Sequence, residues 1–212
     1  MSNIETSANT VIVLDFETTG LSPDYGDRAI EIGAVKIENG VLVEEFQQLM
    51  YPGKRISSFI EDYTGITNSM LKEASSCASV MREFADFVEG YNLVAHNASF
   101  DSRFLAAEFK RVRCKQQREF ACSMLLARRL YQDAPNHKLG TLVSYKSLPN
   151  DGTFHRALAD AQMTAHLWLA MLEDIKSDYA FDDMPFEMMQ ALSRTAKKSV
   201  PTFLSNESKK YS

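Results

Sequence analysis

Two runs of aliphatic residues joined by Asn39-Gly40 place the strongest constraint on how this chain can fold. The runs cover residues 29–37 and 41–46. Asn-Gly between two such runs predicts a β-hairpin, because both turn positions tolerate a positive φ. An apolar, β-branched run over 10–16 predicts a buried strand that ends at a carboxylate, and 93–95 predicts another short strand.

Helical patterns occupy most of the remaining chain. Helices are expected over residues 67–73, 78–89, about 100–113, 123–131, 138–145 and 157–175. The last has an apolar stripe at helical spacing, formed by Leu158, Ala161, Ala165, Leu169 and Leu172. Three early strands followed by alternating helices and strands predict an α/β domain with a mixed sheet.

The composition is that of an ordinary globular chain. Its 212 residues are 45% hydrophobic and 24% charged, with a formal net charge of −5. These values exclude a collagen, a mainly disordered chain and a disulfide mini-scaffold. No apolar run approaches the ~20 residues of a membrane span, and residues 1–10 have no apolar secretory core. Three cysteines without zinc-site spacing fit a reducing compartment, so a cytoplasmic location is expected.

Positive charge gathers in residues 103–129, where eight Lys and Arg stand against Glu108 and Glu119. A polyanion could approach that side of the protein. A solvated helix face is the alternative, and it is preferred for a charge cluster alone. The net charge of −5 argues against a protein that coats nucleic acid by charge alone.

The sequence changes in character after residue 175. Residues 185–196 could form one amphipathic helix, with Phe186, Met189 and Leu192 on one face. The polar end of the chain predicts a loose terminus. Residues 176–212 are therefore expected to form a C-terminal extension of one helix plus a flexible tail.

Two carboxylates, Asp15 and Glu17, lie at the end of the first predicted strand. Residues i and i+2 of a strand point to the same face, so these groups would repel unless a cation lies between them. A surface pair is the common alternative for Asp-x-Glu. This pair leads directly into residues 18–21, Thr-Thr-Gly-Leu, where backbone N–H groups and a glycine could receive a phosphate.

Asp101, His155 and Asp160 also stand at the ends of predicted elements. Asp101 follows a strand and begins a helix, where it could line a crevice or simply support the helix N-terminus. His155 precedes the long helix, and Asp160 lies one turn inside it. A histidine in that place is often a cap or a surface residue, but near carboxylates it could act as a general base.

Four carboxylates and one histidine could thus converge on one edge of the sheet. Hard oxygen ligands without cysteine favour Mg²⁺ or Mn²⁺ over Zn²⁺. Four acids in one place suit two ions about 3.5–4 Å apart, the arrangement that serves phosphoryl transfer.

Three segments of the chain resemble, in order, the motifs of the DnaQ-like DEDDh 3′-5′ exonucleases. They are residues 15–21, 96–101 and 155–161. The step of five residues from His155 to Asp160 is that of the His-type branch of this family. The resemblance covers residues 9–175, the expected exonuclease domain, and implies an RNase H-like α/β fold with a mixed central sheet flanked by helices. It also implies hydrolysis of nucleotides one at a time from a 3′ end.

The resemblance also assigns roles to individual residues. Asp15, Glu17, Asp101 and Asp160 become ligands of two Mg²⁺ or Mn²⁺ ions, with Asp15 bridging, and His155 becomes the general base. Thr18 and Gly20 would hold the terminal nucleotide, Leu21 and Ile66 would pack on its base, Phe100 would lie near the sugar, and His96 and Asn97 would line or brace the site. Core packing is the alternative for Leu21, Ile66 and Phe100. Many relatives carry His where this chain has Thr64, so one contact to the last nucleotide is expected to differ.

The leading hypothesis is an exonuclease on DNA 3′ ends that releases nucleoside monophosphates in proofreading, repair or recycling. Residues 14–20 look closer to polymerase-associated proofreaders, such as the epsilon subunit of bacterial DNA polymerase III, than to oligoribonuclease. An exoribonuclease is the first alternative, because local packing reads the 2′-hydroxyl. A polymerase or repair-complex subunit whose residues 177–212 dock a partner is the second. No membrane is expected among the partners.

Overall fold

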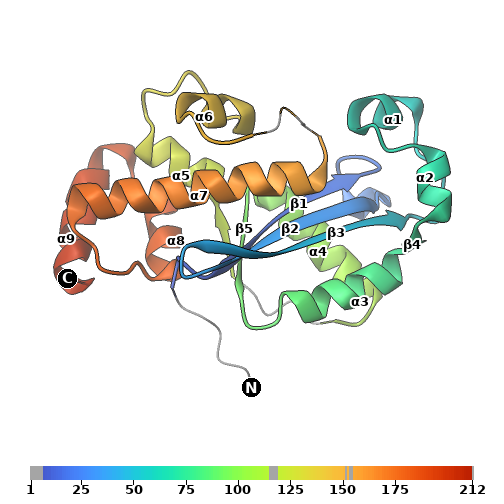
Figure 1. Ribbon diagram of the computed structural model, residues 1–212, viewed down its shortest axis with the longest axis horizontal. Coiled ribbons are helices and arrows are strands. Elements are labelled where there is room, and N and C mark those ends of the chain that lie inside the picture. Colours follow the sequence, from blue (N-terminus) through green and yellow to red (C-terminus); the bar gives the residue numbers. More distant parts are fainter. Residues whose placement is uncertain (1–6, 115–118, 151, 153–154, 212) are drawn as a thin grey trace.

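The computed structural model describes residues 7–114, 119–150, 152 and 155–211, and it centres on a six-stranded mixed sheet (Figure 1). The strand order is β4-β3-β2-β1-β5-β6. The strands are β1 (Val11–Thr18), β2 (Ala29–Glu38), β3 (Val41–Tyr51), β4 (Ser75–Ser76), β5 (Asn92–Ala95) and β6 (Phe120–Cys122). The expected α/β architecture with a mixed sheet is confirmed. The segment before Ser7, and Lys115 and Arg118 of the basic cluster, lie outside the described residues.

The predicted hairpin forms at Asn39-Gly40, where φ is 51° and 78°. It joins β2 to β3 in antiparallel pairing, and β1 pairs antiparallel with the other side of β2. In that register Asp15 lies opposite Gly33, and Glu17 lies opposite Glu31. On its other side β1 pairs in parallel with β5, so both strands end at the same edge of the sheet.

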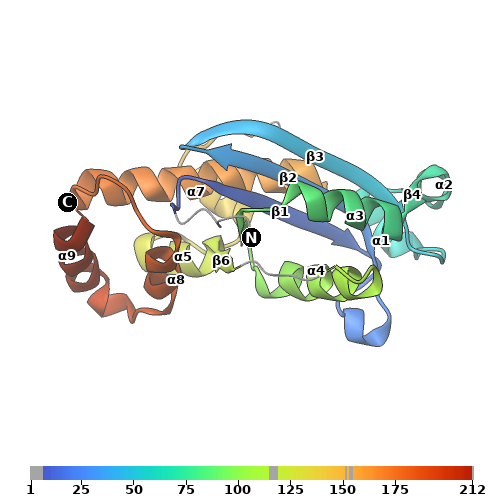
Figure 2. The same ribbon diagram turned by 90° about the horizontal axis from the view of Figure 1, so that it is seen from below.

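Helices cover both faces of the sheet (Figures 1 and 2). Alternate residues of β1 divide between the two cores. Ile12, Leu14 and Phe16 pack with α3 (Cys77–Phe87) and α4 (Ser99–Arg111), whereas Val11 and Val13 pack with α7 (Ala157–Tyr179). Asp15 and Glu17 continue the second set, so their side chains point to the face that α7 covers. The helices are α1 (Ser58–Thr64), α2 (Asn68–Glu73), α3 (Cys77–Phe87), α4 (Ser99–Arg111), α5 (Ser123–Leu130), α6 (Leu139–Tyr145), α7 (Ala157–Tyr179), α8 (Phe186–Arg194) and α9 (Val200–Tyr211), with 3₁₀ turns η1 (Pro23–Tyr25) and η2 (Lys197–Ser199).

The sequence expectations match α2 to α8 within a few residues at each end. The short helix α1 was not expected, and it is capped by Ser57, whose side chain accepts the Ile60 N–H. Its aromatic residues Phe59 and Tyr63 are 70% and 50% exposed. A helix that exposes its large apolar residues shows no buried stripe, which is the signal that sequence reading depends on.

The expected loose tail is wrong, because residues 200–211 form helix α9. Leu204 is 1% exposed and Val200 is 5% exposed, and both belong to the core that α7 and α8 share. Phe203 packs against the same core, so the apolar residues of the first turns dock this helix although its C-terminal half is polar. Among the described residues, none of the helices has the length and apolar character needed to cross a bilayer.

Candidate active site

A cleft of about 770 Å³ opens at the edge of the sheet where β1 and β5 end. Five parts of the chain line it: residues 15–21, helix α1 with Ser57, the segment from His96 to Asp101, Leu139 at the start of α6, and His155 with Asp160. The three segments that carry the predicted motifs therefore meet in one cavity. All the predicted site residues line it except Ile66.

The four carboxylates come from three elements. Asp15 and Glu17 are at the end of β1, Asp101 is in the first turn of α4, and Asp160 is in the first turn of α7. Asp101 is 2% exposed, and its Oδ1 accepts the Phe16 N–H at 3.1 Å. This bond ties α4 to β1 between the two carboxylates of the strand.

Burial raises the pKa of each of these acids, and the charges of neighbouring carboxylates raise it further. Burial raises the pKa of Asp15 well above its ordinary value, and the charges of Asp101, Asp160 and Glu17 raise it further. Burial, then Asp160, raises the pKa of Glu17 to about 8, and burial raises the pKa of Asp101 to about 7. The pKa of Asp160 is also raised, chiefly by burial. Such a cluster cannot stay fully ionised at neutral pH without positive charge among its oxygens, which is the property of a divalent-cation site.

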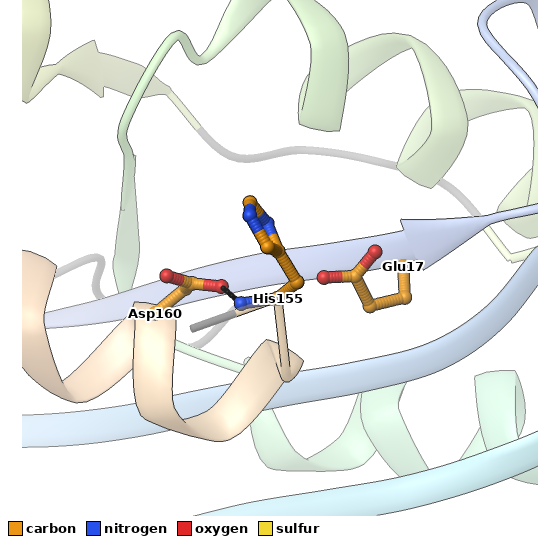
Figure 3. A group of neighbouring side chains, drawn as sticks. All are labelled: Glu17, His155 and Asp160. Carbon is orange, nitrogen blue, oxygen red and sulfur yellow. Dashed lines mark hydrogen bonds between the residues drawn. The ribbon is translucent and has the colours of Figure 1, made fainter. Parts of the chain in front are cut away.

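His155 lies directly beside this cluster (Figure 3). One ligand atom each of Glu17, His155 and Asp160 lie within 4.8 Å of one another. The backbone of His155 has a φ of 61°, and its N–H donates to Asp160 Oδ2 at 3.0 Å. The carboxylate that faces the cleft therefore also fixes the backbone of the histidine.

The turn after β1 is built around Gly20 and Asp27. A Cβ on Gly20 would lie 2.5 Å from an Asp27 carboxylate oxygen. That carboxylate accepts the Thr19 hydroxyl at 3.0 Å and the Ser22 N–H at 3.1 Å, so it is not free to move aside. The Thr18 hydroxyl donates to the Gly20 carbonyl at 2.6 Å, and Leu21 stands 80% exposed at the rim of the cleft.

His96 braces the cleft wall from behind. Its Nδ1 lies 2.9 Å from Ser123 Oγ, and its Nε2 lies 3.0 Å from the His137 carbonyl oxygen. Burial lowers the pKa of His96 to about 4, so the ring is neutral at physiological pH. Both ring nitrogens are engaged, which suits a bracing residue. Phe100 lines the cleft with its ring packed on Phe104 at 4.9 Å between centroids.

Ile66 is the exception among the predicted site residues. Its side chain is 0% exposed and packs with Ile30, Ile56 and Leu71, away from the cleft. The core alternative is therefore correct for Ile66, because a fully enclosed side chain offers no surface to a nucleobase. Thr64 lines the cleft, but its hydroxyl donates to the Ile60 carbonyl and accepts the Ile66 N–H.

The aromatic residues of α1 are the part of the cleft that sequence reading missed. The rings of Phe59 and Tyr63 are stacked, with centroids 6.0 Å apart and planes inclined by 12°. The ring of Tyr63 also lies 4.0 Å from that of His155. The signal available was the pair of aromatic residues four positions apart after the N-capping Ser57.

The described part of the basic cluster lies on α4, on α5 and at Arg113 in the turn after α4. Arg103, Lys110 and Arg111 line a second hollow of about 670 Å³ beside η1. Arg111 is 3.5 Å from Glu108, and Arg103 Nε donates to the Ser99 carbonyl. These contacts are those of a solvated helix face.

Fold and cleft together are those of a nuclease of the RNase H-like class. The chain belongs to the exonuclease family (RNase_T), whose pattern matches residues 12–168, and within it to the DnaQ-like 3′-5′ exonucleases. It is therefore a 3′-5′ exonuclease by family, as the resemblance predicted.

Similar proteins include DNA polymerase III of the PolC type from Caldanaerobacter subterraneus subsp. tengcongensis, 42% identical over 168 residues, and from Bacillus subtilis, 39% identical over 168 residues. Each of these alignments covers 78% of this chain but only 12% of the relative. The chain thus spans about an eighth of the length of these polymerases.

Solved structures give the same fold. Exonuclease X in complex with 5′ overhanging duplex DNA has a TM-score of 0.67 and 26% identity, covering 86% of this chain and 99% of that one. The nuclease domain of 3′hExo, a DEDDh family member bound to rAMP, has a TM-score of 0.67 at 22% identity, with 78% and 92% covered. The RNase H-like fold expected from the sequence is confirmed.

Proposed function

We propose that this exonuclease acts on DNA 3′ ends and releases nucleoside monophosphates with the help of two divalent cations, Mg²⁺ or Mn²⁺. The observation that carries the proposal is the convergence of Asp15, Glu17, Asp101, Asp160 and His155 on one cleft. The names of the similar proteins, a DNA polymerase and an exonuclease crystallised with DNA, support DNA as the substrate.

The four carboxylates are the residues that would hold the cations. Their oxygens are hard ligands, and their raised pKa values mark a surplus of negative charge that two cations would neutralise. Cations bound here supply the charge that activates a water and stabilises the leaving 3′ oxygen. Asp15, with Asp101, Asp160 and Glu17 as electrostatic neighbours, is the proposed bridge.

His155 is the proposed general base. Its exposed imidazole lines the cleft, so a ring nitrogen can take the proton of the attacking water and pass it to solvent. Asp160 contributes in two ways, because one of its oxygens accepts the His155 backbone N–H while the carboxylate faces the cleft. The base and one ligand are thus held as a unit.

The rim of the cleft is the proposed binding site of the terminal nucleotide. Thr18 and Gly20 form the turn that would meet it, and Phe100 would lie near the sugar. Leu21 offers an exposed apolar surface to the base, and stacked aromatic rings on α1 can receive unpaired bases. His96 and Asn97 line the wall behind.

A polymerase or repair complex is the proposed setting, with proofreading as its purpose. The support is the PolC-type polymerases, of which this chain matches one part. We keep residues 9–175 as the catalytic domain and 176–212 as the candidate docking element for a protein partner. Helices α8 and α9 pack on the core, so a partner would meet exposed side chains such as Arg194 on α8 and Lys197 and Lys198 on η2.

The test is a degradation assay with three 5′-labelled substrates: a 3′-mismatched DNA duplex, single-stranded DNA and an RNA oligonucleotide. Each is incubated with Mg²⁺, with Mn²⁺ and with EDTA, beside the Asp15→Ala variant. We expect a cation-dependent ladder that shortens from the 3′ end, strongest on DNA and absent from the variant. Faster degradation of RNA than of DNA would show that RNA is the preferred substrate. A ladder in EDTA or with Asp15→Ala would refute the two-cation mechanism.

A further inference from the structure

Glu31 is a fully buried carboxylate, with 0% exposure, near the start of strand β2. It does not line the active-site cleft, and no cation-binding or catalytic role has been assigned to it above. A buried carboxylate is unfavourable unless it is paired and hydrogen-bonded, so its contacts indicate what holds it there.

The partners of Glu31 lie at the start of α7. Arg156 donates to it twice, from Nε at 3.1 Å and from one terminal nitrogen at 2.8 Å. The backbone N–H of Ala157, the first residue of α7, donates to Glu31 Oε2 at 3.1 Å. A fourth bond comes from Gln47 on the neighbouring strand β3 at 3.0 Å. The carboxylate thus satisfies one free N–H of the helix while the bidentate arginine fixes its direction.

A second contact between β2 and α7 comes from Gly33. A Cβ at this position would lie 2.1 Å from the Leu158 backbone nitrogen, so the first turn of α7 rests directly on the strand. Glu31 and Gly33 therefore hold α7 from the same face of β2, two residues apart.

The strand register connects these contacts to the chemistry. Glu31 lies opposite Glu17 in the β1–β2 pairing, and Gly33 lies opposite Asp15. The residues that anchor α7 are thus the direct neighbours of the two carboxylates on β1. His155 and Asp160 lie immediately before and within the anchored turn.

We propose that Glu31 is a positioning residue for the active site, acting through Arg156 and the first turn of α7. It sets the places of His155 and Asp160 relative to the carboxylates of β1. The proposal rests on the catalytic assignment made above, and it adds residues outside the cleft to the machinery.

The test is Glu31→Gln, which keeps the size of the side chain and removes its charge. On a short single-stranded DNA oligonucleotide we expect kcat to fall about 10- to 100-fold, as for other groups that orient a site from behind. KM is expected to change little, because Glu31 does not touch the cleft. Calorimetric titration of the DNA-free protein with Mn²⁺ should show weaker binding, independently of activity.

Glu108→Gln is the matched control. Glu108 is 1% exposed and accepts two bonds from Arg28, at 2.7 and 2.9 Å, plus a long one from the Ala29 N–H at 3.5 Å. Its hydrogen-bond and ion-pair partners among the described residues lie outside α7. This variant should lose similar thermal stability while it keeps kcat and Mn²⁺ affinity. An equal fall in kcat for the control would show a general effect of stability and overturn the proposal.

The double variant Glu31→Gln with Arg156→Gln separates positioning from folding. It removes the ion pair without leaving an unpaired buried charge, so its melting temperature should recover relative to Arg156→Gln alone. We expect kcat to stay as low as in Glu31→Gln. Recovery of kcat together with stability would show that the pair is only structural.

Failure of the positioning role can be told apart from failure of the catalytic assignment. If Asp15→Ala keeps normal turnover, the catalytic assignment itself is wrong. If Asp15→Ala is inactive while Glu31→Gln keeps normal kcat and Mn²⁺ affinity, only the positioning role is overturned.

Discussion

The imidazole of His155 lies 4.0 Å from the ring of Tyr63, measured between centroids, with the planes inclined by 32°. His155 is thus held by a ring contact from α1 and by its own backbone bond to Asp160. Tyr63 stacks in turn on Phe59. Tyr63 of this short helix therefore contacts the proposed general base directly, and Phe59 packs behind Tyr63.

Tyr63→Ala should lower kcat roughly tenfold or more, because a catalytic group that is free to move leaves its productive geometry. Tyr63→Phe keeps the ring and should retain most of the activity. Steady-state kinetics on single-stranded DNA would measure both variants. Normal kcat in Tyr63→Ala would mean that His155 does not need the ring contact.

Asp15→Asn should abolish activity and yet stabilise the cation-free protein. Burial and four neighbouring acids, Glu31 among them, raise the pKa of Asp15, so its charge opposes folding when no cation is present. A neutral amide removes that repulsion. Thermal melting in EDTA at pH 8 should show a higher Tm than wild type, and the rise in Tm on adding Mn²⁺ should shrink. Asp182→Asn, at an exposed position, should change neither.

The stability of the cation-free protein should fall as pH rises. The pKa of Glu17 is raised from 4.5 to about 8, so the folded state holds its proton where the unfolded state has lost it. The contribution of Glu17 to the free energy of unfolding is therefore fully present below pH 4.5 and is lost as pH rises through 8. Urea unfolding in EDTA at several pH values would measure it as the difference between wild type and Glu17→Gln. A wild-type slope equal to that of the variant would contradict the raised pKa.

His96 should make the protein sensitive to acid. Burial lowers its pKa from 6.5 to about 4, so the unfolded chain takes up the proton first. The contribution of neutral His96 to the free energy of unfolding is intact above pH 6.5. It is lost as pH falls toward 4, and the total loss is about 3 kcal/mol. The free energy of unfolding of His96→Gln should vary less across this range.

Leu204→Ala should lower the free energy of unfolding by about 2–4 kcal/mol, because it opens a cavity beneath α9. Thr202→Ala, on the exposed side of the same helix, should have little effect. Chemical denaturation followed by circular dichroism would compare them. Equal stability of the two variants would show that α9 is not part of the cooperative core.

The sequence was sufficient for the elements whose patterns are local. The hairpin at Asn39-Gly40 and the long apolar stripe of α7 need no tertiary information to be recognised. The strands β4 and β6, of two and three residues, carry no period that could be detected, and they exist because neighbouring strands offer hydrogen bonds.

The candidate site divides in a similar way. Its carboxylates could be found because each stands at the end of an element with a strong pattern. Ile66 was misplaced because an apolar residue next to a motif has no local mark that distinguishes a cleft wall from a core. Glu31 was missed for the opposite reason, since a charged residue in a strand is expected at the surface.

The Phe16 N–H donates to Asp101 Oδ1, so one oxygen of that carboxylate already accepts a hydrogen bond. A cation bound here would be held through the remaining lone pairs of the Asp101 carboxylate. An asparagine at this position has one side-chain oxygen, and that oxygen would accept the Phe16 N–H. Its NH₂ group would then point toward the cleft. Asp101→Asn would thus place a hydrogen-bond donor where a Lewis base is needed. At this position a side chain of the same shape does not have the same chemistry.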